Sequence, residues 1–327
     1  MWLREIPFYT LVTNAFQLGA PEQQGRDRPR SRRFNMKISQ LGEFALIDAL
    51  EKFTPVFKEV IKGIGDDAAV LPYSKDKYLL LTTDMLAEDT HFTRLMPPQL
   101  IGHKSLACNI SDIAAMGGVP TFAVVSIGIP KNLPVRFIKE VYKGIQLVAQ
   151  SFNVSIVGGD TIKTDKIVIN IALLGLVEKK YLIRRDGAKP GDWIFVTGPL
   201  GGSFKSGRHL NFIPRVRQAR FLVEKFRPSA MMDISDGLAG DLNHILKASK
   251  VGARLDHASI PRHKGVSFLQ ALNDGEDFEL LFTLSPKRAR LLMDWQVKQR
   301  SFYFYPIGAI TKDVKERINS KSFTHFQ

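Results

Sequence analysis

Acidic motifs that directly follow β-rich runs are the feature of this 327-residue chain that most restricts its possible folds. Three such motifs occur, and each ends in an aspartate: LLLTTD (79–84), VSIVGGD (154–160) and MMDISD (231–236). In open α/β folds, ligands bind outside the carboxyl ends of the strands. The sequence therefore predicts an α/β protein whose separated aspartates, Asp84, Asp160, Asp233 and Asp236, are directed at one site.

Helical patterns alternate with β-rich runs from residue 36 onward, which is typical of an α/β architecture. The runs that we expect to be strands are 78–82, 122–129, 154–157, 167–176, 193–197, 230–232 and 278–284. The expected helices are 38–51, 104–116, 134–152, 238–249 and 286–297. Pro190-Gly191 marks a seam, so we expect an N-terminal domain over 36–182 and a C-terminal α/β domain over 183–327.

Residues 1–35 differ in character from the rest of the chain. The stretch 21–33 is polar, rich in arginine and contains proline, whereas an amphipathic helical pattern starts directly after Met36. Three interpretations stay open: a disordered tail, a targeting segment, or a start codon assigned upstream of a working start at Met36. A secretory signal is disfavoured because Arg4, Glu5 and Pro7 disrupt its charged-then-apolar order. We therefore treat 1–35 as an appendage outside the fold.

Composition favours a globular protein of the cytoplasm. The chain is 44% hydrophobic and 24% charged, which is the ordinary globular range. Its one cysteine, Cys108, is most simply a small buried helix residue, and it excludes an internal disulfide. The apolar stretch 167–177 contains Asn170 and is about half the length of a membrane span. We expect a soluble protein that does not associate with membranes.

The net charge of +14 raises the possibility of a nucleic-acid partner, because clustered lysine and arginine attract phosphate backbones. The basic residues of 203–228 and 287–290 are scattered, however, and lack the interleaved aromatic residues of an RNA- or DNA-binding module. A solvated basic surface that attracts small anionic substrates is the preferred interpretation. We expect no nucleic-acid partner, and a basic nucleic-acid-binding protein remains an alternative function.

The segment GIGDDA (63–68) has the spacing of a dinucleotide fingerprint but the wrong charge for one. A phosphate-cradling loop presents backbone N–H groups to the anion, whereas Asp66 and Asp67 would repel it unless a cation stood between them. Two unit charges about 4 Å apart repel by about 4 kcal/mol at an effective dielectric constant of about 20. A cluster of aspartates therefore needs protonation or bound cations, and Mg²⁺ is the natural ion because it bridges carboxylates to substrate phosphates.

Each acidic motif also has a purely structural interpretation. Turns would account for the pair Asp66-Asp67 and for Asp160, and an exposed helix face would account for Asp112. Asp233 and Asp236 could cap the helix expected over 238–249. The combination of the motifs indicates a metal site more strongly than any one of them.

Three further groups of residues have both a functional and a purely structural interpretation. His91 could be a ligand-contacting residue or a surface histidine, and Arg184 or Arg185 could clamp a phosphate or supply surface charge. Glu276 and Asp277 precede an expected strand and could orient a second substrate.

Seven motifs resemble those of the thiamine-monophosphate kinase family, in order along the chain: GIGDDAAV (63–70), TTD (82–84) with His91-Phe92, NISDIAAMG (109–117), VGGDT (157–161), GAKPGDW (187–193), DISDGL (233–238) and GEDFEL (275–280). The resemblance implies the two-domain aminoimidazole ribonucleotide synthetase-like fold and a homodimer whose N-terminal domains pair into a β-barrel. It also implies the reaction, transfer of the ATP γ-phosphoryl group to thiamine monophosphate, which yields thiamine diphosphate and ADP.

The same resemblance implies residue roles. The Mg²⁺ ligands would be Asp67, Thr82, Thr83, Asp84, Asp112, Asp160, Asp233 and Asp236. The ATP contacts would be Tyr142, Gly159, Asp160, Arg185 and Ser235, and the thiamine contacts would be His91, Glu276 and Phe323. Asp84, Asp112 and Asp160 are the expected catalytic residues. The segment 199–228 departs from the family pattern because it lacks an Ala- and Leu-rich helix, and 1–35 has no counterpart.

We expect direct in-line transfer, because the acceptor is an anionic phosphate oxygen that needs no strong base. Another ATP-using enzyme of the same superfamily is the nearest alternative, although the selenophosphate synthetase and hydrogenase-maturation members would be expected to carry a terminal cysteine that this chain lacks. A non-catalytic nucleotide sensor is disfavoured because every acidic motif is retained.

Overall fold

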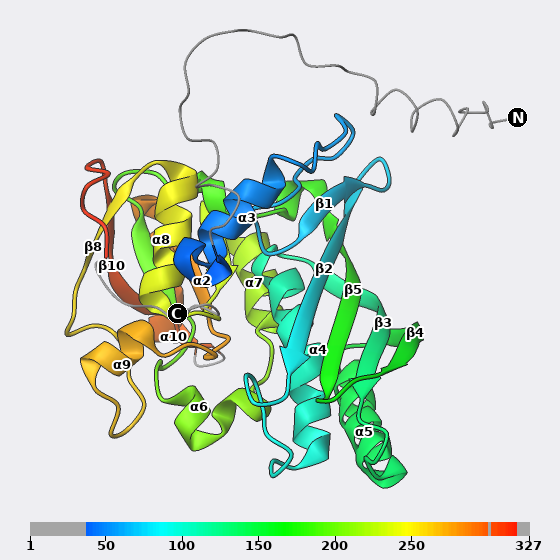
Figure 1. The fold of residues 1–327 in the computed structure, drawn as a ribbon. Coiled ribbons are helices and arrows are strands. Elements are labelled where there is room, and N and C mark those ends of the chain that lie inside the picture. The colour runs from blue at the N-terminus through cyan, green and yellow to red at the C-terminus, as the bar shows by residue number, and fades with distance from the viewer. Residues whose placement is uncertain (1–36, 300–301, 319–327) are drawn as a thin grey trace, which may run out of the picture.

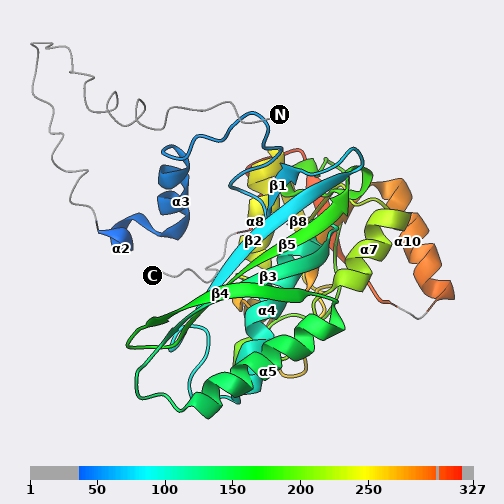
Figure 2. The same cartoon turned by 90° about the vertical axis from the view of Figure 1, so that its right-hand side faces the viewer.

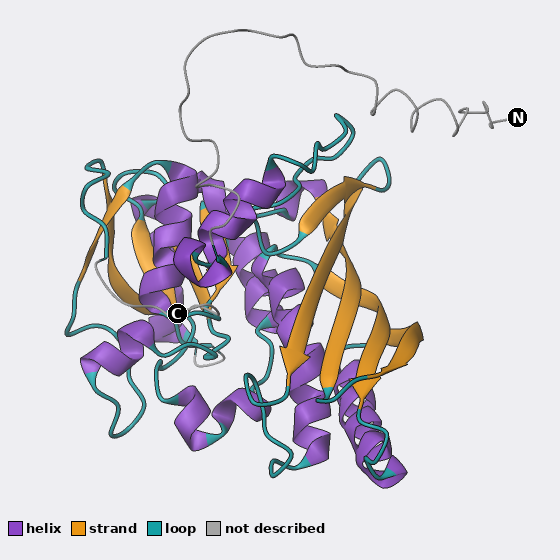
Figure 3. Ribbon diagram, in the orientation of Figure 1, coloured by secondary structure: helices purple, strands orange, loops and turns teal. Residues whose placement is uncertain are grey.

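The computed structural model describes residues 37–299 and 302–318, so the appendage 1–35 and the position Phe323 lie outside the described residues. Two five-stranded sheets organise the chain, each with its own helices (Figure 1, Figure 3). The last strand of the first sheet ends at Glu178, and the first strand of the second begins at Trp193. The fold is therefore mixed α/β, as the alternating patterns predicted.

The first sheet has the strand order β1-β2-β5-β3-β4. Its strands are β1 (Ala69–Pro72), β2 (Lys77–Ala87), β3 (Val119–Ile129), β4 (Ser155–Lys163) and β5 (Val168–Glu178). Neighbouring strands are antiparallel except for the parallel pair β3 and β4. Helices α4 (Pro98–Ala115) and α5 (Val135–Ser151) pack on the face that carries the buried residues of β5.

Helices α4 and α5 approach each other closely because glycine stands at their contact. A Cβ atom at Gly102 would lie 1.9 Å from the carbonyl oxygen of Val141, and one at Gly144 would lie 1.9 Å from that of Gln99. Any side chain at these two positions would force the helices apart. The two glycines therefore fix how α4 lies against the sheet, and α4 carries Asp112.

The opposite face of the first sheet, here called the outer face, carries apolar side chains that stay exposed in the part of the chain that the structure describes. Strands β2, β5 and β3 lie in front of α4 when this face is viewed directly (Figure 2). Its exposed apolar side chains come from three strands: Leu81, Met85, Phe122, Val124, Val157 and Ile162. A contiguous apolar surface of this kind usually marks a protein contact.

The second sheet has the order β7-β9-β6-β10-β8 and is antiparallel throughout. Its strands are β6 (Trp193–Val196), β7 (Ala230–Asp233), β8 (Gly252–Leu255), β9 (Leu280–Leu284) and β10 (Tyr305–Thr311). The core on one face includes α8 (Leu238–Ser249) and α9 (Phe268–Asn273), and the core on the other includes α7 (Val216–Lys225) and α10 (Pro286–Lys298). Both faces of this sheet are therefore buried within the chain.

The remaining elements are short: α2 (Ile38–Leu41), α3 (Glu43–Glu51), α6 (Ser203–Ser206), and the 3-10 turns Lys179–Tyr181, Arg185–Gly187 and Arg208–Leu210. The single helix predicted over 38–51 is divided at Gly42, whose φ of +80° is left-handed. The short elements β1, β8, β10, α6, α7 and α9 were not predicted. Among the described residues, no helix is long and apolar enough to cross a membrane.

Two strands extend further than predicted, and this corrects the expected placement of two acidic motifs. Asp84 and Asp160 lie inside β2 and β4, not after them. Strand β2 continues because β5 pairs with it as far as Ala87. Strand β4 continues through Gly159, where a Cβ atom would lie 1.9 Å from the carbonyl oxygen of Val125. Only Asp233, the last residue of β7, and Asp236 after it match the predicted strand-end position.

Candidate functional site

Three aspartates from distant parts of the chain meet between the two sheets. Carboxylate oxygens of Asp67, Asp112 and Asp233 lie within 4.8 Å of one another. Asp67 precedes β1, Asp112 lies on α4, and Asp233 ends β7. Helix α4 brings them together because its last residues, Ala114 and Ala115, pack into the core beside α7 of the second domain. We call this group the carboxylate cluster.

The carboxylate cluster has few donors for its charge. The Arg185 guanidinium donates a hydrogen bond of 2.6 Å from Nη2 to Asp67 Oδ1. Hydroxyl groups serve the other two carboxylates: Ser111 donates to Asp233 at 2.5 Å, and Thr82 donates to Asp112 at 2.6 Å. The second oxygen of Asp67, Oδ2, is buried without a hydrogen-bond partner in the described part of the chain.

Burial makes the charged forms of these aspartates unfavourable. It raises the pKa of Asp233 to about 8, with the Asp67 charge as the next cause, and raises that of Asp112 well above its ordinary value, with the Asp84 charge second. Burial, followed by the Asp236 charge, raises the pKa of Asp84 to about 6. A bound cation would reverse these effects by stabilising the ionised carboxylates. The donor set of hard oxygens fits Mg²⁺.

A cavity of about 810 Å³ lies along one face of α4 and meets the carboxylate cluster at Asp112, the one member of the cluster in its lining. Lys104, Cys108 and Asp112 are four residues apart and therefore lie on the same face of the helix. Lys104 contacts Glu276, and Glu276, Cys108 and Asp112 line the cavity. Eight residues of helix separate Lys104 from Asp112 by about 12 Å. The cavity thus has a carboxylate end at Asp112 and a second end at Glu276. We call the second end the aromatic end, because Phe204 and Phe278 line the cavity together with Glu276.

The cavity gathers many of the residues singled out from the sequence. Its lining includes Asp84, His91, Asp112, Ser235, Asp236 and Glu276. Asp84 reaches it from the face of β2 that meets α4, where its backbone N–H donates to Asn109 Oδ1 at 3.0 Å. Arg185 is the arginine that contacts Asp67, whereas Arg184 is bonded to Asp186.

Four predicted site residues lie outside both this cavity and the carboxylate cluster with its hydrogen-bond partners, within one chain. Gly159 and Asp160 are on the edge strand β4, Tyr142 is exposed on α5, and Thr83 is on the outer face, where it bonds to Asn170. The register places Gly159 in the same row as Asp84 with β5 and β3 between them. Three strand spacings amount to about 14 Å. One chain therefore does not bring β4 to the carboxylate cluster.

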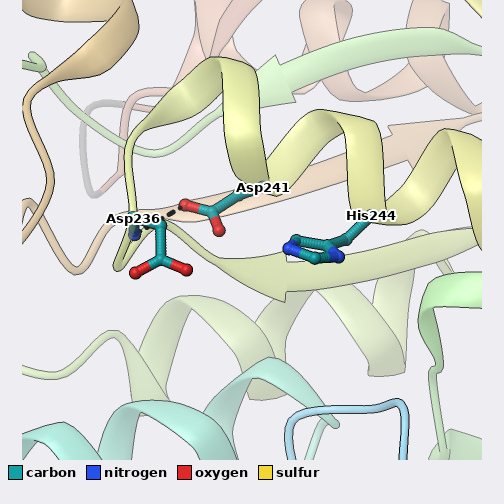
Figure 4. A group of neighbouring side chains, drawn as sticks. All are labelled: Asp236, Asp241 and His244. Atoms are coloured by element: carbon teal, nitrogen blue, oxygen red, sulfur yellow. Dashed lines mark hydrogen bonds between the residues drawn. The ribbon is translucent and has the colours of Figure 1, made fainter. Parts of the chain in front are cut away.

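The cap interpretation of Asp233 and Asp236 is wrong. The N-cap of α8 is Gly237, and no side chain forms a capping hydrogen bond there. Asp236 instead lies beside Asp241 and His244 of α8, with ligand atoms within 4.8 Å (Figure 4). Asp241 Oδ2 accepts a hydrogen bond of 3.1 Å from the backbone N–H of Asp236. Asp241 and His244 were missed in the sequence, although the three-residue spacing DLNH places both on one helix face.

Lys104 and His209 were also missed. At the aromatic end, Lys104 Nζ contacts Glu276 Oε2 and lies 3.0 Å from His209 Nδ1. Both side chains are fully buried. No local sequence signal identifies them, because Lys104 meets its carboxylate partner 172 residues away along the chain.

Two family models match successive parts of the chain, and curated relatives match most of its length. The model for the N-terminal domain of AIR synthase related protein matches residues 65–177, and the model for its C-terminal domain matches 189–321. The thiamine-monophosphate kinase of Bacillus subtilis is 36% identical over 312 residues, which cover 86% of this chain and 94% of the relative. That of Rhodopirellula baltica is 40% identical over 73% of this chain and 81% of the relative.

The fold is also similar to solved structures. A structure of AaThiL complexed with AMPPCP and TMP superposes with a TM-score of 0.79 at 32% identity, and the match covers 89% of this chain and 99% of the other. That protein therefore holds an ATP analogue and TMP on a fold that this chain shares nearly throughout its described length.

Proposed function

The chain belongs to the AIR synthase related family, and from this premise we propose that it is a kinase that phosphorylates thiamine monophosphate with ATP, producing thiamine diphosphate and ADP. Its relatives over most of its length are thiamine-monophosphate kinases. The observation that carries the proposal is the cavity that is lined both by Asp112 of the carboxylate cluster and by Glu276. An elongated phosphate ester with a polar ring system fits such a two-ended cavity.

Mg²⁺ fits the carboxylate cluster because the unpartnered Oδ2 of Asp67 and the three converging carboxylates form an oxygen-rich, charge-deficient site. We propose these ligands within one chain: Asp67, Thr82, Asp84, Asp112, Asp233 and Asp236. Mg²⁺ held by these residues would neutralise phosphate charge that otherwise opposes the approach of ATP to a second phosphate.

The side chains of this enzyme act mainly by holding two anionic substrates in line. The acceptor phosphate oxygen is already ionised, so no residue needs to remove a proton from it. Arg185 supplies a guanidinium beside Asp67 for bidentate contact with a phosphate of ATP. Ser235 lines the cavity beside Asp236 and offers a hydroxyl donor. Correct alignment of donor and acceptor can account for much of the rate enhancement in such transfers.

We further propose that the enzyme is a homodimer in which the outer faces of two first sheets pack together into a barrel. Two features support this: the outer face is apolar and exposed, and Tyr142, Gly159 and Asp160 lie away from the cavity of their own chain. A second copy packed on the outer face would deliver β4 to a site that one chain leaves incomplete. Association in this form accounts for the proposed role of Asp160 in binding Mg²⁺ and ATP. We propose the cytoplasm, where ATP is available, as its compartment.

The decisive assay combines the purified protein with ATP, Mg²⁺ and thiamine monophosphate, and quantifies thiamine diphosphate and ADP together. The two products should appear in equal amounts and only when both substrates are present. ADP formation without thiamine diphosphate would contradict the proposed function.

A further inference from the structure

The segment 203–212 places two aromatic stacks beside the cavity. Phe204 of α6 stacks on His209 with ring centroids 4.5 Å apart, and Phe212 stacks on Phe278 at 4.0 Å. Phe204 and Phe278 both line the cavity, but Phe278 is buried whereas Phe204 is 49% exposed. Phe204 therefore covers His209 with one face and leaves much of its ring available to a ligand.

The His209 ring beneath Phe204 belongs to a buried network centred on Glu276. His209 Nδ1 lies 2.9 Å from Glu276 Oε2, which also contacts the Lys104 ammonium. Lys104 and His209 are fully buried, and Glu276 is the member of the network that lines the cavity. Burial acts to raise the pKa of Glu276, but the His209 hydrogen bond and the Lys104 charge outweigh it and lower that pKa. The network thus presents an ionised carboxylate to the cavity.

The second ring nitrogen of His209 indicates that this histidine has a functional role. His209 Nε2 is buried and has no hydrogen-bond partner in the described part of the chain. A buried polar atom without a partner is unfavourable, and such atoms in native proteins commonly have a functional reason. The polar contacts of the His209 ring in the described part of the chain are with Lys104 and Glu276, so this ring serves to orient the Glu276 carboxylate.

Glu276 is also held in an unusual backbone conformation. Its φ is +65° and that of Phe278 is +50°, both in the left-handed region that non-glycine residues seldom adopt. Such strain persists where the surrounding structure over-determines it, and it concentrates at ligand-binding sites. The Glu276 carboxylate is therefore positioned from two directions, by its backbone and by the buried network.

Thiamine monophosphate matches the two ends of the cavity in chemistry. Its phosphate belongs at the carboxylate end, and its thiazolium and aminopyrimidine rings would then extend toward Glu276, which contacts Lys104 about two helical turns before Asp112 on α4. A cationic ring is attracted to an aromatic face, and a carboxylate accepts a hydrogen bond from an amino group.

We propose that Phe204 supplies an aromatic face to the subsite for the thiazolium and aminopyrimidine rings, beside the Glu276 carboxylate that the family resemblance already implies as a thiamine contact, and that His209 is a positioning residue that orients Glu276. This inference rests on the proposed function and deepens it. It assigns a substrate-binding role to the segment that departs from the family pattern in sequence.

Two substitutions at Phe204 test the subsite. Phe204→Leu keeps an apolar side chain but removes the aromatic face, whereas Phe204→Tyr keeps that face. We expect Phe204→Leu to raise KM for thiamine monophosphate about tenfold, as the loss of a cation–π contact predicts. KM for ATP should stay unchanged, and Phe204→Tyr should resemble the wild type. Thiamine without its phosphate should inhibit competitively, and Phe204→Leu should raise its Ki by the same factor.

The matched control is Tyr303→Leu, an exposed aromatic residue outside the cavity lining, which should leave both KM values unchanged. If wild-type enzyme forms thiamine diphosphate and Phe204→Leu leaves KM for thiamine monophosphate unaltered, the subsite assignment is wrong while the proposed function stands. Absence of thiamine diphosphate from the wild-type reaction would instead remove the proposed function itself. Equal increases in both KM values would also overturn the assignment.

His209 is tested by a pair of variants that separate positioning from folding. Asn can place its amide nitrogen near the position of Nδ1, so His209→Asn should preserve the contact with Glu276, whereas His209→Leu removes it. His209→Leu should raise KM for thiamine monophosphate, keep kcat for the saturated enzyme, and be rescued by His209→Asn. A fall in kcat with no change in KM, or no difference between the two variants, would overturn the positioning role.

Discussion

The two sheets have five strands each, yet they differ in how many of their faces the chain itself covers. Alternate residues of the second sheet enter separate cores: Leu281 packs with α8 and α9, while Phe282 packs with α7 and α10. In the first sheet, Leu80 is fully buried against α4, but its neighbour Leu81 is exposed on the outer face. Both faces of the second sheet are therefore buried within the chain. The first sheet has one apolar face that stays exposed in the described residues.

Because of this difference, the two sheets supply different residues of the site. The complete sheet holds Asp233 rigidly at the end of β7, inside a core. The half-covered sheet supplies Asp84 on its inner side and carries Asp160 on its edge strand. Under the proposed function, the inner side serves the chain's own cavity and the outer side serves association with a second copy.

The largest effect is expected on the inner side, at Asp112. Asp112→Asn keeps the shape of the side chain but removes its charge, so the carboxylate cluster should lose cation binding and kcat should fall by about 10³-fold. The folded protein should persist because burial already disfavours the charged form of Asp112. Steady-state rates at saturating Mg²⁺ and circular dichroism would measure both effects.

The control for Asp112→Asn is Asp192→Asn, a buried aspartate of the second domain outside the cavity lining, which should keep its kcat. Near-normal turnover of Asp112→Asn at saturating Mg²⁺ would remove Asp112 from the proposed ligand set.

The second-largest effect is expected on the outer face of the first sheet. Phe122→Glu places a charge in the exposed apolar surface of β3, and in a symmetric dimer two such charges would be buried together. We expect a monomer by light scattering and the loss of most activity, because β4 of a partner would no longer reach the cavity. Leu291→Glu, at an exposed apolar position on α10, should retain the wild-type mass and activity. A fully active monomer would refute the association that we propose.

A third prediction contrasts the stability of the two sheets. Phe282 is fully buried in β9 and stacks on Phe195 at 5.2 Å, so Phe282→Ala should destabilise the fold by about 3–5 kcal/mol. This loss should not depend on protein concentration. Phe122→Ala should instead change the midpoint of thermal unfolding in a concentration-dependent way, as expected of an interface. Thermal unfolding at two protein concentrations tests both, and the same behaviour for both variants would remove the distinction.

The smallest effect concerns pH. Without metal, the folded-state pKa is about 6 for Asp84 and about 8 for Asp233, above the value of about 3.9 expected in the unfolded chain. The folded metal-free protein therefore binds more protons than the unfolded chain, and its stability falls as pH rises through 6 to 8. Mg²⁺ needs the ionised carboxylates, so it should raise Tm more at pH 8 than at pH 6. An equal or larger increase at pH 6 would contradict this interpretation of the cluster.

Much of the secondary structure could be predicted from the sequence, because the patterns that determine it lie within each segment. The amphipathic pattern around Val141 and Ile145 predicted α5 almost to its ends, and the apolar runs predicted seven of the strands. The ends of β2 and β4 could not be predicted, because the length of a strand depends on pairing partners elsewhere in the chain. The network of Lys104 and His209 was missed for the same reason, since neither residue carries a signal of its own burial.

By itself, the sequence determined which side chains are available for the chemistry, because aspartates in glycine- and serine-containing motifs beside apolar runs require protonation or a bound cation when they meet. It also determined the family through the order of those motifs. Only the tertiary structure decided which aspartates meet within one chain. Strand order places β5 and β3 between Asp84 and Gly159, while α4 carries Asp112 across to Asp233 in the other domain. Proximity follows from how sheets and helices pack, and that packing is a property of contacts between distant residues.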